Sequence, residues 1–393
     1  MFLSVVNVVQ ANQVTVTEEA LLTKYSGTYK SEIINHEQAF SIYLPESYKH
    51  TNKHYPIVYV LDGDFLFSTA VNTSKIRASR GLMPESIVIG FSTISNRFNV
   101  AMPIKRSKDA TDIAFKNGNP SAFLKFLSQE FNPYLEQKYR VANFKTIIGM
   151  SPTAGLVFHD YIQADPQFDA HVAISAEIQL FTVEGESLVD RIATRSKDNN
   201  STFLHLSRGE TDFENNPDLP ALFETMANKL KGSDKATVEI IADGEHYGSS
   251  LEAINRAFAH IFPTEVDFIN IRKKEGFVDE LKAIYQAFGK EYGFKFYPID
   301  DGYWFGNSVA GTNRYLLRNN RSAEAIELLT WAIADDPNNI RHRYNLTWAY
   351  EVNGQNQAAL ESVQELVSIA ELQQHKSLAL FKGYLTELQE QKK

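Results

Sequence analysis

Cysteine is absent from this chain of 393 residues, which excludes disulfides, thiolate metal sites and a cysteine nucleophile. The absence leaves the cellular compartment open, because exported proteins can also fold without cysteine. The sequence also has no His-Glu-x-x-His motif, no paired histidine and carboxylate cluster at metal spacing, and no Gly-x-Gly-x-x-Gly motif. We therefore expect neither a metal ion nor a cofactor.

Clusters of lysine and arginine interleaved with aromatic residues are missing as well, and the net charge is -9. Such a chain is not expected to bind nucleic acid or an anionic membrane surface. No run approaches the ~18 apolar residues that a membrane span needs, so no span is expected. What remains is a globular composition of 43% hydrophobic, 12% aromatic and 22% charged residues, in a chain long enough for two domains.

Residues 1–11 form a short apolar stretch followed by small residues, with no positively charged segment before it. The stretch resembles the end of a secretory signal peptide, and the alternative is a frayed first strand. The first interpretation favours a periplasmic or secreted location over a cytoplasmic one.

Short apolar runs alternate with longer amphipathic helical patterns up to about residue 263. Apolar strand runs are typical of a parallel sheet that helices cover on both faces. The alternation therefore predicts an α/β fold with a doubly wound, mostly parallel sheet. Period-two patterns at 27–33 and 40–44 predict antiparallel strands at one edge. The expected parallel strands are 57–61, 87–91, 147–149, 172–174, 203–206 and 238–241.

Beyond this region the chain becomes helical, and a repeat with a period of 34 residues relates Ala325 to Ala359. Tetratricopeptide repeats have this period, so we predict an all-α, tetratricopeptide-like tail; a generic bundle of helical hairpins is the alternative. We expect a sheet domain over 15–264, a connecting helix and linker over 265–300, and the tail over 301–393. Such a tail suits a protein or peptide partner.

Three residues point to catalytic chemistry. Ser151 stands between a strand pattern and a helix pattern, and Asp212 and His246 follow later, each just after a predicted strand. Nucleophile, acid and histidine occur in this chain order in α/β hydrolases, where the serine lies on a sharp turn between strand and helix. Glu210, two residues before Asp212, is a competing acid.

Four segments resemble the putative-esterase family of α/β hydrolases, which includes serine esterases acting on siderophore trilactones, S-formylglutathione and feruloyl esters. The resemblance implies an α/β-hydrolase fold and a small-molecule ester substrate. It also implies a Ser151, Asp212 and His246 triad, with the backbone N–H of Asp64 as an oxyanion donor. The segments that carry it are 40–45, 55–64, 131–134 and 246–249, and the Leu-Asp-Gly element at 61–63 is the most specific.

The chain departs from this family where the chemistry should occur. The family motif Gly-His-Ser-x-Gly-Gly is Gly-Met-Ser-Pro-Thr-Ala at 149–154, and in the segment 97–103 Val100 and Met102 replace an acid and a threonine. Pro152 has no N–H to serve as the second oxyanion donor. Replacement donors would be the hydroxyl or the N–H of Thr153.

Pro152 also bears on the conformation of Ser151. A residue before proline is pushed toward extended backbone, so we expect Ser151 to avoid the strained turn, or to act only as the N-cap of the following helix. Two functions stay open. One is a serine esterase that forms an acyl-enzyme. The other is a weak or inactive hydrolase-fold scaffold that binds a ligand or a protein.

Overall fold

A computed structural model describes residues 24–93, 119–176, 178, 182–183, 186–198, 202–213, 219–262, 265–300 and 307–391. The predictions for residues 1–11 and 97–103 lie outside these ranges. Within them, no helix is long and apolar enough to cross a membrane.

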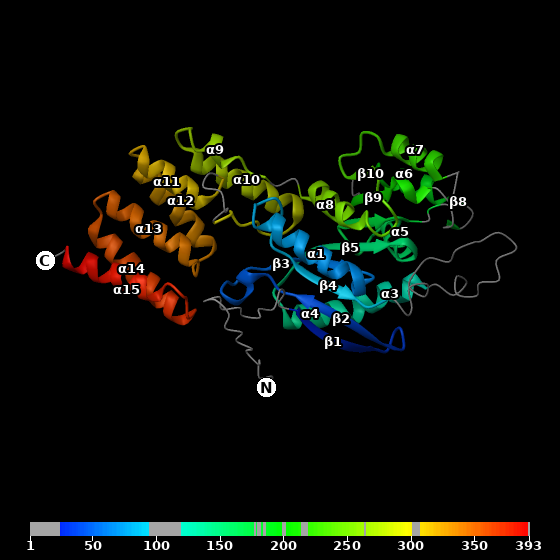
Figure 1. Cartoon of the computed structure of the whole chain (residues 1–393), viewed down its shortest axis with the longest axis horizontal. Helices are drawn as coiled ribbons and strands as arrows, with labels where there is room; N and C mark the ends of the chain where they lie inside the picture. The colour runs from blue at the N-terminus through cyan, green and yellow to red at the C-terminus, as the bar shows by residue number, and fades with distance from the viewer. Residues whose placement is uncertain are drawn as a thin grey trace, which may run out of the picture.

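The N-terminal part is built on one eight-stranded sheet (Figure 1). Strand β2 runs antiparallel to both of its neighbours, and all the other neighbouring pairs are parallel. The predicted doubly wound, mostly parallel sheet with an antiparallel edge is therefore confirmed. Across the sheet the strands are β1 (Lys24–Ser31), β2 (His36–Tyr43), β4 (Ile87–Phe91), β3 (Tyr55–Val60), β5 (Val141–Met150), β6 (Ala170–Ile174), β9 (Phe203–Gly209) and β10 (Ala236–Ile241). A separate hairpin joins β7 (Thr182–Val183) to β8 (Glu186–Ser187).

Helices cover both faces of the sheet, which explains why its central strands read as continuous apolar runs. On β3, Ile57 and Tyr59 belong to the core on one face, whereas Val58 and Val60 belong to the core on the other. One face carries α1 (Gly63–Ala78) and α8 (Ser250–Ile261). The opposite face carries α3 (Pro120–Phe126), α4 (Asn132–Lys138), α5 (Ala154–Tyr161), α6 (Leu188–Arg195) and α7 (Leu219–Leu230).

The C-terminal part is a series of helices in which each of the last five packs against the next (Figure 1). Ala325 on α12 and Ala359 on α14 are both fully buried, so the two related positions of the repeat lie where paired helices approach closely. The tetratricopeptide assignment and the three domain boundaries stay predictions. The helices are α9 (Phe268–Ile271), α10 (Phe277–Tyr292), α11 (Val309–Arg318), α12 (Ser322–Asp335), α13 (Ile340–Val352), α14 (Asn356–Leu372) and α15 (Leu378–Glu390).

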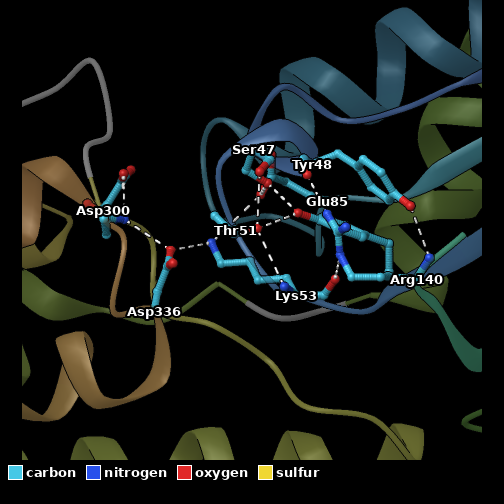
Figure 2. A network of polar contacts seen from close by, with 10 residues as sticks. Ser47, Tyr48, Thr51, Lys53, Glu85, Arg140, Asp300 and Asp336 are labelled. Carbon is cyan, nitrogen blue, oxygen red and sulfur yellow. Dashed lines mark hydrogen bonds and ion pairs between the residues drawn. The ribbon is translucent and has the colours of Figure 1, made fainter. Parts of the chain in front are cut away.

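A partly buried ion pair joins the helical part to the sheet part (Figure 2). Lys53 Nζ lies 3.0 Å from Asp336 Oδ2 in the helical part and 4.0 Å from Glu85 Oε2 in the sheet part. Burial lowers the pKa of Lys53, but the carboxylates of Asp336 and Glu85 outweigh burial and raise it overall. Lys53 is thus held as a cation between two carboxylates from different parts of the chain.

Candidate active site

Four non-glycine backbone positions with positive φ follow parallel strands of the sheet. They are Asp62 after β3 (φ 56°), Ser151 after β5 (φ 55°), Ser175 after β6 (φ 46°) and Asp243 after β10 (φ 53°). Because these strands are parallel, the four positions lie along the same edge of the sheet. Non-glycine residues in this conformation are strained and gather at functional sites, so this edge is the candidate active site.

Ser151 adopts the strained turn that the following proline led us not to expect. It begins the 3-10 helix Ser151–Thr153, which leads from β5 into α5, and the N-cap position falls on Met150 rather than on Ser151. Both the expectation of an extended Ser151 and the N-cap alternative are therefore wrong. The turn is also tightly packed, since a Cβ on Gly149 would lie only 2.7 Å from the Thr153 carbonyl oxygen.

A buried hydrogen-bond network explains how the turn holds against the preference of the residue before proline. Asp62 is fully buried, and its carboxylate accepts hydrogen bonds from the hydroxyls of Thr153 (2.6 Å) and Thr93 (2.7 Å). The Thr153 hydroxyl also accepts the N–H of Met150 at 2.9 Å. The network ties the turn after β3 to the turn after β5, so tertiary contacts outweigh a local backbone preference.

This network also removes one predicted oxyanion donor. The Thr153 hydroxyl is buried and directed to the Asp62 carboxylate, so its expected role as a replacement for the missing Pro152 N–H is wrong. Sequence reasoning marked the Leu-Asp-Gly element as specific but assigned no role to Asp62, whose partner Thr153 is 91 residues away.

Asp64 lies in the first turn of α1, beside the network. Its carboxylate accepts the Ser92 hydroxyl at 2.7 Å and the Thr93 N–H at 3.1 Å. These two hydrogen bonds hold the exposed carboxylate, while the backbone of Asp64 belongs to the amino end of a 16-residue helix. A helix amino end favours negative charge, which suits the neighbourhood of an oxyanion.

The structure brings Asp212 and His246 together. Nδ1 of His246 lies 2.9 Å from Oδ1 and 3.0 Å from Oδ2 of Asp212. Glu210, the competing acid, instead accepts the backbone N–H of Asp243 at 3.1 Å. Sequence spacing could not separate the two acids, because both lie on the same short helical turn, Glu210–Phe213.

Two glycines let the loops that carry these side chains meet. A Cβ on Gly209 would lie 2.4 Å from the carbonyl oxygen of Gly244, closer than any real contact allows. The same carbonyl accepts the N–H of Thr211 at 3.0 Å. The loops after β9 and β10 are thereby joined just before Asp212 and His246.

Arg208 and Ser175 are site residues that the sequence analysis missed. The guanidinium of Arg208 is almost completely buried and lies beside Asp212, with Nε 3.2 Å from Oδ2. The hydroxyl of Ser175 donates to the backbone oxygen of His246 at 3.2 Å. For Arg208 a signal existed, since it is a charged residue two positions after the predicted strand 203–206, and in the structure it lies within β9.

An aromatic pair flanks the site. Phe65 follows Asp64 in the chain and Tyr247 follows His246, and their rings meet edge to face at 6.0 Å. Tyr247 also packs against the imidazole of His246 at 4.9 Å, although 58% of its surface is exposed. The pair presents apolar surface next to the histidine. In the part of the chain that the structure describes, no group of three or more histidine or acidic side chains could hold a metal ion.

Comparisons with known proteins agree with this architecture. The model of a family described as "Putative esterase" matches residues 31–245, more than half of the chain. A curated relative, the uncharacterized protein YbbA of Bacillus subtilis, is 26% identical over 111 residues, which are 28% of this chain and 44% of the relative. The chain thus spans less than half the length of that relative.

Solved structures extend the likeness in fold. An IroE-like serine hydrolase from Shewanella oneidensis superposes with a TM-score of 0.62 at 14% identity, covering 78% of this chain and 97% of that protein. An uncharacterised protein from Capnocytophaga ochracea has a TM-score of 0.58 at 19% identity and covers 93% and 99%. The second match is long enough to take in helices of the C-terminal part.

Proposed function

Because this chain belongs to the family described as "Putative esterase", we propose that it is a serine hydrolase that cleaves carboxylic esters through an acyl-enzyme. The observation that carries the proposal is the contact of His246 Nδ1 with the Asp212 carboxylate at 2.9 Å, at the sheet edge where Ser151 adopts φ 55°. An orienting acid on Nδ1 leaves Nε2 as the nitrogen that exchanges a proton with the nucleophile.

In the proposed first step, the Ser151 hydroxyl oxygen attacks the ester carbonyl carbon while His246 Nε2 takes the hydroxyl proton. The tetrahedral oxyanion is stabilised by the backbone N–H of Asp64, and it collapses when the alcohol leaves with the proton returned by His246. Asp212 stabilises the imidazolium formed between these events. In the second step, water attacks the acyl-enzyme by the same proton route and releases the acid and Ser151.

Pro152 sets the expected rate of this reaction. A backbone N–H after the nucleophile normally gives the second oxyanion hydrogen bond, and proline has none. Losing one such donor costs about 3 to 4 kcal/mol of transition-state stabilisation, or roughly a hundred- to thousandfold in kcat. We therefore propose a slow esterase, whose ester places an apolar group against Phe65 and Tyr247.

The same proline favours a second candidate function, a hydrolase-fold scaffold without turnover. In that role the helical part, which we propose is tetratricopeptide-like over 301–393, would hold a protein or peptide partner. The sheet domain (15–264) and the connecting segment (265–300) would then be structural support. Pro152, together with Met150 in place of the family's histidine, is the observation that favours this function.

A fluorophosphonate probe together with turnover of short-chain aryl esters separates the two functions. The esterase predicts labelling of wild-type protein at Ser151, loss of labelling and turnover in Ser151→Ala, and strong loss in His246→Ala. Ser74→Ala is the matched control, since Ser74 is a buried serine on α1 whose hydroxyl donates to the Val71 carbonyl within the same helix. Turnover that is unchanged in Ser151→Ala would remove the esterase.

A further inference from the structure

We propose that Arg208 is the positioning residue that holds Asp212 in place for His246; this inference rests on the proposed esterase function. The three guanidinium nitrogens of Arg208 each lie near a different oxygen. Nη2 donates to the Asp212 backbone oxygen at 2.9 Å, Nη1 donates to the Ala176 backbone oxygen at 3.1 Å, and Nε lies 3.2 Å from Asp212 Oδ2.

The contacts to Asp212 fix both its main chain and its carboxylate. A guanidinium is planar and rigid, so one group that bonds the backbone oxygen and pairs with the side chain restricts where the carboxylate can turn. The Asp212 carboxylate in turn presents both oxygens to His246 Nδ1, at 2.9 and 3.0 Å. Through these contacts Arg208 acts on His246 by way of Asp212.

The contact to Ala176 brings a third strand end into the arrangement. Ala176 follows Ser175, whose hydroxyl donates to the His246 backbone oxygen, so the turn after β6 contacts Arg208 on one side and the histidine loop on the other. Asp212 and His246 are thereby both held by the turn after β6, and β6 is the neighbour of β5, the strand that ends just before Ser151.

Burial makes this a role that other residues cannot fill. Arg208 is 3% exposed, and a buried cation is tolerated only where it is paired and hydrogen-bonded. Lysine would keep the charge but offer a single ammonium, which cannot donate to the Asp212 and Ala176 backbone oxygens from two separate nitrogens as Arg208 does. Methionine would keep an unbranched chain of similar reach and lose the charge and all donors.

The test compares Arg208→Lys and Arg208→Met with wild-type protein, using fluorophosphonate labelling kinetics and aryl ester turnover. We expect kcat and the limiting labelling rate to fall roughly 10- to 100-fold in Arg208→Met, with KM and probe affinity unchanged, because a small misplacement of catalytic groups costs about this much. Arg208→Lys should recover part of the loss. Guanidinium ion, well below denaturing concentration, should speed Arg208→Ala.

Arg140→Met is the matched control. Arg140 also donates to backbone carbonyls, those of Lys53 and Tyr48 (Figure 2). It directly precedes β5, whereas Ser151 directly follows that strand, so Arg140 lies at the other end of β5 from the candidate site. It should lose thermal stability without a selective loss of kcat, and guanidinium should not speed Arg140→Ala.

The outcomes are distinguishable from those of the esterase proposal itself. Wild-type protein without labelling at Ser151 would remove the esterase. Wild-type labelling together with wild-type rates in a folded Arg208→Met, or equal rates in the lysine and methionine variants, would remove only the role of Arg208. If Arg208→Met does not fold, two comparisons still test the role of Arg208. The role predicts a lower kcat in Arg208→Lys than in wild-type protein at equal KM, and it predicts that guanidinium speeds Arg208→Ala; the absence of both effects would remove the role.

Discussion

Replacing Pro152 by alanine tests the main chemical defect of this site, because it restores the N–H that the proline lacks. The backbone around it is already arranged: Ser151 has φ 55°, and the hydroxyl of Thr153 is fixed on Asp62. Alanine therefore adds a donor without having to rebuild the turn. We expect kcat to rise about 100- to 1000-fold, which is the usual contribution of one oxyanion donor.

The expected cost in stability is small enough for the variant to fold. Removing proline frees the unfolded chain, at about 0.4 to 1 kcal/mol. Pro152 is buried, and losing about two ring methylene groups costs roughly 1.6 kcal/mol more. The sum, about 2 to 3 kcal/mol, is less than the 5 to 15 kcal/mol by which domains are typically stable.

The assay is steady-state turnover of a short-chain aryl ester, with kcat and KM determined separately. Pro120→Ala is the matched control, because Pro120 is also buried and also begins a helix, α3. It should lose similar stability and leave kcat unchanged. If Ser151 is labelled in both proteins but kcat of Pro152→Ala stays within about twofold of wild type, roughly 0.4 kcal/mol, the missing donor is not what limits this enzyme.

Three further predictions concern stability. Thr153→Val should lower the unfolding free energy by about 2 to 4 kcal/mol in urea titrations, because the buried Asp62 carboxylate loses a charged hydrogen bond; a loss below about 0.5 kcal/mol would contradict the network. Burial lowers the pKa of His342 to about 4, below its unfolded value of about 6.5, so the folded state binds fewer protons. Stability should therefore fall by up to about 3 kcal/mol as pH drops from about 6.5 to about 4, and thermal melting of His342→Gln should show a flatter dependence there. Lys53→Met should lower the unfolding free energy by about 3 to 5 kcal/mol, because the buried Asp336 carboxylate loses its cation. Adding Asp336→Asn should recover part of this unfolding free energy in urea titrations, and no recovery would mean that the ion pair is not the cause.

The order of strands and helices in the sheet part could be predicted because buried positions are apolar, and their spacing is visible in a short stretch of sequence. Central strands such as β3 and β4 are apolar at every position, whereas β1 alternates, and these periods are visible without knowing what packs against them. The order of Ser151, Asp212 and His246 along the chain is likewise a linear property. Their association was a prediction, and the structure brings the last two into contact.

Three features of the site could not be read from neighbouring residues. The conformation of Ser151 follows from the bond between Asp62 and Thr153, across 91 residues, which outweighs the local effect of Pro152. The choice of Asp212 over Glu210 follows from a loop contact 34 residues away. The pairing of Arg208 with Asp212 is short in sequence, yet its burial depends on the turn after β6.

The pattern of apolar and polar residues along the chain thus determined which segments became strands and helices, because its period distinguishes a strand from a helix within a few consecutive residues. Tertiary structure alone decided how the ends of those strands meet. The reason is that hydrogen bonds and ion pairs between distant turns, each worth a few kcal/mol when buried, exceed the backbone preferences of single residues.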